Sequence, residues 1–136
     1  MTRASERGNS VVRAVEQAAA LYNVPAYRMQ SRVFDIGSKG RVRPMFTGQW
    51  RDALGVRHTS GMADLLSTPK LRVIGKDGEA WLATVLWVEC KAGAGRQSET
   101  QRDFQIHVES CGAFYLLAGD SADQVIQWFK DHGVER

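Results

Sequence analysis

The chain has 136 residues, 43% hydrophobic and 24% charged, which suits one globular domain with its own core. No stretch approaches the ~20 apolar residues of a membrane span and no basic segment leads into an apolar signal, so we expect no membrane association and a cytoplasmic protein. The two cysteines, Cys90 and Cys111, are too few for a disulfide framework or a zinc site, and both are expected in the core.

The formal net charge of +3 is unevenly distributed along the chain. Residues 28–57 hold seven basic and two acidic side chains, whereas residues 98–136 hold three basic and seven acidic ones. A basic segment opposite an acidic one favours a surface for a polyanion. A solvated basic loop fits the same numbers, and charge alone does not separate the two interpretations.

The chain is predicted to begin with a helix followed by a strand. Over residues 5–22, apolar residues recur every three or four positions with alanines between them, which is typical of a helix. By this periodicity Glu16 lies towards the core, whereas Glu6 lies near the exposed start of the helix. Residues 26–36 carry β-branched and aromatic side chains and are expected to form a strand, with a turn at residues 37–40.

A basic insertion follows at about residues 39–58. We expect a long excursion from the core, with a hairpin turning at residues 52–55. Arginines alternate there with Phe46 and Trp50, a combination suited to DNA phosphates and bases. The alternative, which we favour for the two aromatic residues, is that they anchor the loop on the core.

Three strands are predicted in the middle of the chain. Residues 62–67 form a short strand bearing Asp64. Residues 71–74 and 80–91 form two more, joined by a tight turn at residues 76–78.

The rest of the chain is predicted to alternate helices and strands. Ser98 and Gln101 form a capping box that begins a helix. Residues 113–118 form an apolar strand, and Asp120 or Ser121 caps the last helix. A strand–helix–strand unit implies parallel pairing, so the predicted fold class is α/β, with a mixed sheet flanked by helices.

The strand over residues 80–91 ends on two charged residues. Side chains alternate along a strand, so Glu89 and Lys91 project to one face and Cys90 to the other. If the strand bearing Asp64 is a neighbour, its carboxylate converges with Glu89 and Lys91. Two carboxylates and the Cys90 backbone carbonyl suit Mg²⁺, and a desolvated lysine can orient or deprotonate a water. The alternative is a surface ion pair at a strand end, and spacing alone favours it.

A resemblance to a known family emerges when three segments are taken together in this order. They are residues 61–64 with Asp64, residues 87–91 with Glu89 and Lys91, and the glycine-containing loop 93–98 leading to Gln101. This arrangement resembles the PD-(D/E)xK nuclease signature, in particular its VRR-NUC branch, which includes small phage and prophage proteins related to Holliday-junction resolvases. Ala63 departs from the family, where proline is usual before the aspartate, but this position supplies no ligand.

The resemblance implies a restriction-endonuclease-like domain over residues 1–136, with elements in the order α-β-β-β-α-β-α. It implies cleavage of DNA that depends on Mg²⁺ or Mn²⁺. We expect selectivity for branched or junction DNA, and the sequence does not choose among ends, flaps, nicks and four-way junctions. Asp64 and Glu89 would ligate the metal and Lys91 would assist the water. Gln101 matches a helix glutamine beside the family's active site, although its capping role competes with a catalytic one.

Further expectations follow from the same resemblance. The family's leading-helix glutamate is assigned to Glu16 in preference to Glu6. Arg28 either touches a phosphate or is a surface arginine, with neither favoured. The remaining residues expected to contact DNA are Arg41, Arg43 and Arg96.

Cleavage of both strands of a junction or duplex needs two active sites, so we expect a homodimer. The rival hypothesis is a non-catalytic DNA-binding module on a nuclease-like scaffold. It is disfavoured because the chain keeps both carboxylates and the lysine. A third hypothesis, a non-catalytic subunit of a larger phage assembly, would require an exposed apolar surface.

Overall fold

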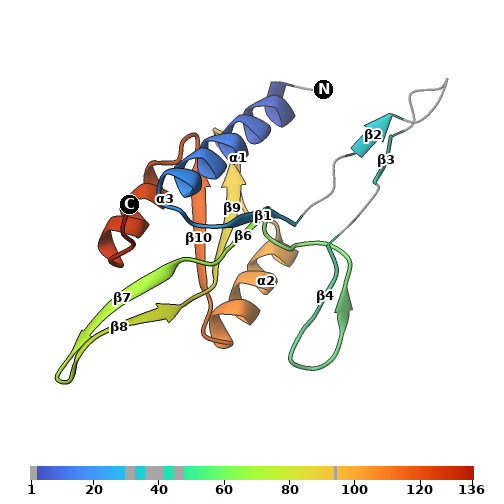
Figure 1. Ribbon diagram of the computed structural model, residues 1–136. Coiled ribbons are helices and arrows are strands. Elements are labelled where there is room, and N and C mark those ends of the chain that lie inside the picture. Colours follow the sequence, from blue (N-terminus) through green and yellow to red (C-terminus); the bar gives the residue numbers. More distant parts are fainter. Residues whose placement is uncertain (1–2, 30–32, 36–41, 45–47, 94) are drawn as a thin grey trace.

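The chain folds into a mixed α/β structure, as predicted (Figure 1). The computed structural model describes residues 3–29, 33–35, 42–44, 48–93 and 95–136. Within these residues the chain forms three helices, a four-stranded mixed sheet and three two-stranded hairpins. None of the helices in this part of the chain is long and apolar enough to cross a membrane.

The main sheet has the spatial strand order β1-β6-β9-β10. Its strands are β1 (Ala26–Arg28), β6 (Leu65–Ser67), β9 (Leu86–Lys91) and β10 (Phe114–Gly119). β6 is antiparallel to both of its neighbours, whereas β10 runs parallel to β9. The parallel pair is joined by α2 (Glu99–Ser110), which confirms the predicted strand–helix–strand unit.

Helices cover both faces of the sheet (Figure 1). α1 (Arg3–Leu21) and α3 (Asp123–Asp131) pack on the face that carries Val88 and Cys90, whereas α2 packs on the face that carries Trp87. The alternation of side chains along β9 therefore supplies two apolar layers. The larger layer includes Val15, Leu65, Val88, Val125 and Phe129 among its fully buried side chains.

The start of α2 has the predicted capping box. Ser98 Oγ accepts a hydrogen bond from the Gln101 backbone N–H at 3.2 Å, and Gln101 Oε1 accepts one from the Ser98 backbone N–H at 2.8 Å. Phe104 and Val108 are buried. The expectation that Cys111 lies in the core is wrong, because its side chain is exposed. The helix ends at residue 110, so the helical spacing from Val108 does not extend to Cys111.

The strand predicted for residues 26–36 is divided into two separate strands. β1 belongs to the main sheet, whereas β2 (Val33–Asp35) pairs with β3 (Val42–Pro44) in a hairpin of its own. The single-strand prediction is therefore wrong, because the two halves pair with different partners. The turn predicted at residues 37–40 lies outside the described residues.

The strand predicted for residues 80–91 is also divided. β8 (Gly78–Ala83) pairs only with β7 (Lys70–Gly75) among the described strands, and two residues separate β8 from β9. The break lies at Thr84, whose backbone N–H donates to the Pro69 carbonyl at 3.1 Å. The predicted tight turn is confirmed, but its hairpin projects from the main sheet, and β6 is the antiparallel neighbour of β9 (Figure 1).

The third hairpin joins β4 (Trp50–Arg51) to β5 (Arg57–His58) and lies beside α2 (Figure 1). Its turn lies at residues 52–55, as predicted. Trp50 is buried against Phe104 of α2, with ring centroids 5.3 Å apart, so the anchoring interpretation is confirmed for Trp50. Phe46 lies outside the described residues.

Candidate active site

Asp64 and Glu89 meet at the end of the pairing between β6 and β9. The strand predicted for residues 62–67 is shorter than expected, because β6 begins at Leu65 and Asp64 lies one residue before it. Leu65 is opposite Val88 in the antiparallel register, so Asp64 lies next to Glu89, the residue after Val88. The Asp64 carbonyl accepts the Met29 backbone N–H at 2.9 Å, which fixes the backbone just before β6. The Asp64 side chain then accepts the backbone N–H of Cys90 through Oδ2 at 2.8 Å. The neighbouring strands predicted from sequence are therefore in contact at this point.

Glu89 is the most unusual residue of the site because its carboxylate is almost fully buried, with a relative accessibility of 2%. Its Oε1 accepts a hydrogen bond from Gln101 Nε2 at 2.9 Å and lies 3.4 Å from Lys91 Nζ. Its Oε2 is buried without a hydrogen-bond partner among the described residues. A buried polar atom is normally paired, so this oxygen is available for a ligand.

Gln101 performs two roles with the two ends of its amide group. Its oxygen accepts the Ser98 backbone N–H and completes the cap of α2, while its nitrogen donates to Glu89. The predicted capping role is therefore confirmed and coexists with a contact to Glu89, while a catalytic role for Gln101 stays a prediction. The cap holds the amide in the orientation that directs its nitrogen towards Glu89.

Burial dominates the electrostatics of the two carboxylates. Desolvation raises the pKa of Glu89 to about 8, the nearby Asp64 carboxylate adds to the increase, and Lys91 opposes it. Burial also raises the pKa of Asp64, against the effects of the Cys90 N–H and of Lys91. Two carboxylates this close in a desolvated site favour retention of a proton, and a bound cation would reverse that preference.

Cys90 directs its side chain away from the site and its backbone groups towards Asp64. Its thiol points into the core beneath α1, and burial raises the pKa of that thiol. Its backbone N–H points to Asp64. Because a strand residue directs its N–H and C=O groups to the same side, the Cys90 carbonyl lies on the Asp64 side as well.

The backbone around Lys91 is held by Asp120, a residue whose role the sequence did not reveal. The Asp120 backbone N–H donates to the Lys91 carbonyl at 3.1 Å, and its Oδ1 accepts the Gly93 backbone N–H at 2.6 Å. Asp120 adopts a left-handed backbone conformation with φ +61. The sequence predicted a helix cap at Asp120 or Ser121, but the N-cap of α3 is Ala122 and makes no side-chain hydrogen bond.

Glu16 and Arg28 form a pair of their own on the α1 side of the sheet. Arg28 Nε and Nη2 donate to Glu16 Oε1 at 2.9 and 2.5 Å. Arg28 is close enough to Asp64 to lower the pKa of that carboxyl, although burial outweighs its effect. Glu16 thus contacts the surroundings of the site through Arg28 and does not share the hydrogen bonds of Glu89. The side chain of Glu6 lies outside the described set.

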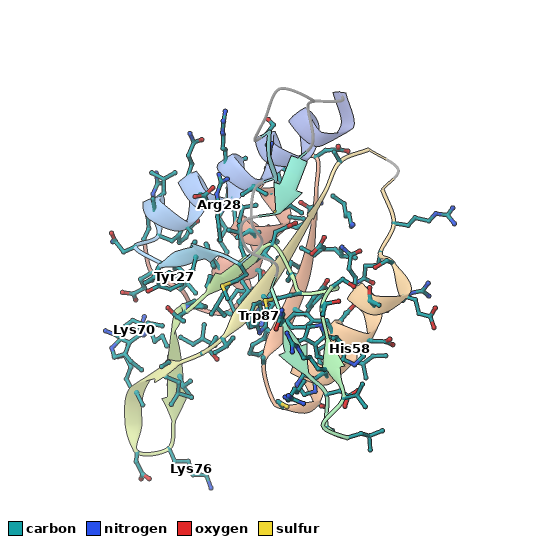
Figure 2. The ribbon with its side chains drawn as sticks, turned by 90° about the vertical axis from the view of Figure 1, so that its right-hand side faces the viewer. Tyr27, Arg28, His58, Lys70, Lys76 and Trp87 are labelled. Carbon is teal, nitrogen blue, oxygen red and sulfur yellow. The ribbon has the colours of Figure 1, made fainter. Side chains whose placement is uncertain are left out.

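The structure describes the side chains of only some of the basic residues that are expected to contact DNA. Arg96 is exposed in the loop between Lys91 and α2. Arg43 lies in β3, where the structure describes the backbone but not the side chain, and Arg41 lies outside the described residues. Figure 2 shows the side of the molecule on which Arg28, Trp87 and His58 are labelled.

The donor set of the site fits a small hard cation. Two carboxylates and a backbone carbonyl are oxygen ligands, and magnesium is commonly held by one or two carboxylates while it keeps several waters. The unpaired Oε2 of Glu89 is a ligand atom without a competing partner in the described structure. Among the described residues, no group of three or more His, Cys, Asp or Glu side chains is placed to hold a metal ion.

No family model matches this chain, and neither a curated protein nor a solved structure shows significant similarity to it.

Proposed function

We propose that this protein is a DNA endonuclease of the PD-(D/E)xK type that depends on Mg²⁺ or Mn²⁺, with a restriction-endonuclease-like core. The observation that carries this proposal is the buried Glu89 carboxylate, which has one oxygen without a partner and lies beside Asp64 and Lys91. A buried carboxylate of this kind is costly unless a proton or cation compensates it. A purely structural site would be expected to satisfy both of its oxygens.

Each residue of the site has a distinct role in this proposal. Asp64, Glu89 and the Cys90 carbonyl would hold the cation, which when bound would supply positive charge to the phosphate and to the attacking water. Lys91 orients the attacking water at Nζ as an ammonium, or takes a proton from it once Nζ has lost one of its own. Gln101 fixes the position of Glu89 through its hydrogen bond to Oε1.

The proposal extends to substrate and assembly. Arg28, Arg41, Arg43 and Arg96 would contact DNA phosphates, with branched or junction DNA as the substrate. A homodimer would supply the second active site for the opposite strand. The place of action would be the cytoplasm of a bacterial cell.

The test is cleavage of a labelled panel containing duplex, single-stranded, flap and four-way junction DNA, each with Mg²⁺, Mn²⁺ or EDTA. We expect metal-dependent cutting that Lys91→Ala lowers by about 10²- to 10⁴-fold, the usual contribution of general acid–base catalysis. Lys130→Ala removes an exposed lysine from α3 and is the matched control, which should cut normally.

Asp64→Asn tests whether Asp64 is a metal ligand, through Mg²⁺ affinity measured beside the cleavage assay. It should weaken both Mg²⁺ affinity and cleavage, and unchanged metal affinity would count against Asp64 as a ligand. Binding of the DNA panel without cutting under every metal would instead favour the non-catalytic DNA-binding module.

A further inference from the structure

The β4–β5 hairpin carries an apolar residue at its tip in a position that the core does not explain. Leu54 lies in the turn and is 90% exposed, the highest value among the large hydrophobic side chains that the structure describes. Its neighbour Val56 is 53% exposed. The hairpin stands out from the body of the molecule (Figure 1), and burial of the Leu54 side chain contributes almost nothing to the fold.

The turn that presents Leu54 is held rigidly from within. Asp52 Oδ1 accepts the backbone N–H groups of Leu54 and Val56, each at 2.9 Å, and Gly55 N donates to the Asp52 carbonyl at 3.0 Å. His58 Nε2 lies 2.9 Å from Asp52 Oδ2, which fixes the carboxylate in turn. A turn with this many internal bonds loses little conformational freedom on binding.

The base of the hairpin is anchored beside the candidate active site. Trp50 stacks on His58, with ring centroids 4.2 Å apart, and its Nε1 donates to the Ser60 carbonyl at 2.8 Å. Gly61 packs so closely against the first turn of α2 that an added Cβ would lie 2.4 Å from the Thr100 carbonyl oxygen. The hairpin therefore has a defined orientation relative to Gln101 and Glu89.

Two arginines flank the exposed tip. Arg51 Nη1 donates to the Gly55 carbonyl at 3.0 Å, and Arg57 Nη2 donates to Gln49 Oε1. Each guanidinium keeps further N–H donors, and both residues are exposed. The single acid of the turn, Asp52, already has His58 as its partner. The tip thus combines an apolar side chain with two cations. Such a surface is complementary to a polyanion that exposes an apolar surface between its charged groups.

We propose that the β4–β5 hairpin binds duplex DNA at a distorted base step, with Leu54 inserted at the unstacked bases and Arg51 and Arg57 on the flanking phosphates. Apolar wedges inserted between base steps are a known means of recognising or producing bent DNA, and arginines position such wedges through phosphate contacts. A step that is already unstacked costs less to enter than a paired one. This inference rests on the proposed function and adds the feature of DNA that the protein selects.

The test measures binding in EDTA, so that no strand is cut. The probes are a duplex with one unpaired base next to 2-aminopurine and a fully paired duplex of the same sequence. We expect wild type to bind the distorted duplex more tightly and to raise its 2-aminopurine fluorescence. Leu54→Ala should lower this preference about tenfold and remove the fluorescence change, because alanine buries much less apolar surface between the bases. Ile74→Ala is the matched control, since Ile74 is 75% exposed on the β7–β8 hairpin, and it should behave as wild type.

The arginines are tested through the salt dependence of the same binding. The slope of log K against log salt is negative for DNA binding. Replacing Arg51 and Arg57 together by Gln should make this slope shallower by about 1.8, for the loss of two phosphate contacts on B-form DNA. The matched double change to Lys keeps both charges and should keep most of the slope.

Several outcomes would overturn this inference. Equal affinity of wild type for both duplexes, no binding of either, or an unchanged preference in Leu54→Ala would each reject it. A change in the oligomeric state of Leu54→Ala on sedimentation would assign the tip to a protein contact instead. The two proposals fail separately, because Leu54-dependent binding without cutting rejects only the nuclease, whereas cutting with an unchanged preference rejects only the wedge.

Discussion

At the scale of single residues, the site depends on how Glu89 is compensated. Its pKa of about 8 arises first from burial and then from the Asp64 carboxylate, and Lys91 only partly offsets them. The folded protein therefore holds a proton on Glu89 more tightly than the unfolded chain does, with an ordinary pKa of 4.5. The resulting stability is fully present below about pH 4.5 and is lost as the pH rises through about 8.

Glu89→Gln should remove this pH dependence. In EDTA, we expect the variant to melt several degrees above wild type at pH 8.5, with a much smaller difference at pH 5, because each pKa unit is worth about 1.4 kcal/mol. Thermal unfolding followed by circular dichroism at both pH values measures the effect. An equal increase in melting temperature at pH 5 and pH 8.5 would show that the stabilisation comes from packing and not from ionisation.

Asp120 is expected to act as a positioning residue for Lys91. Asp120→Ala should lower kcat by about tenfold through loss of the Gly93 contact, whereas Asp120→Asn keeps an oxygen acceptor and should retain most activity. Asp120→Gly separates the hydrogen bond from the backbone, since glycine accepts φ +61 without strain. Normal cleavage by the glycine variant would show that only the backbone conformation matters.

At the scale of elements, α2 links the fold to the site through one amide side chain. Ser98→Ala removes the side-chain cap and should destabilise the protein by about 1 kcal/mol, with little change in kcat. Gln101→Glu keeps a capping-box residue but replaces the donor to Glu89 by a second negative charge. It should therefore lose cleavage and also some stability, because a second carboxylate faces the buried Glu89, whereas Ser98→Ala should lose stability alone. Denaturant unfolding beside the nuclease assay measures both, and normal cleavage by Gln101→Glu would leave Gln101 with the capping role alone.

The divided strands show where local patterns stop predicting elements. The run over residues 80–91 is apolar enough for one continuous strand, yet β8 pairs with β7 while β9 pairs with β6 and β10. The change of partner at Thr84 requires a bend that side-chain periodicity does not encode. The same reason explains why β1 and β2 belong to different sheets.

At the scale of the whole molecule, the expected homodimer can be tested through its activity. In a dimer that cuts both strands, wild type mixed with excess Lys91→Ala should form pairs with one active site. Such pairs should accumulate nicked duplex, because only one strand is cut in each encounter. Gel analysis of a plasmid substrate, with sedimentation at the same concentration, measures this. A product distribution that does not change with the mixing ratio would indicate independent monomers.

The sequence by itself determined the local features of the site. Strand alternation placed Glu89 and Lys91 on one face and Cys90 on the other, the capping box located the start of α2, and the strand–helix–strand order required parallel pairing. Each of these follows from a period or a contact within a few residues. The tertiary structure alone decided that Glu89 is buried with an unpaired oxygen, that Asp120 holds the Lys91 backbone and that Cys111 faces solvent. These properties depend on which distant segments pack together. Contacts between distant segments produce no periodic pattern in the sequence, so they could not be predicted from it.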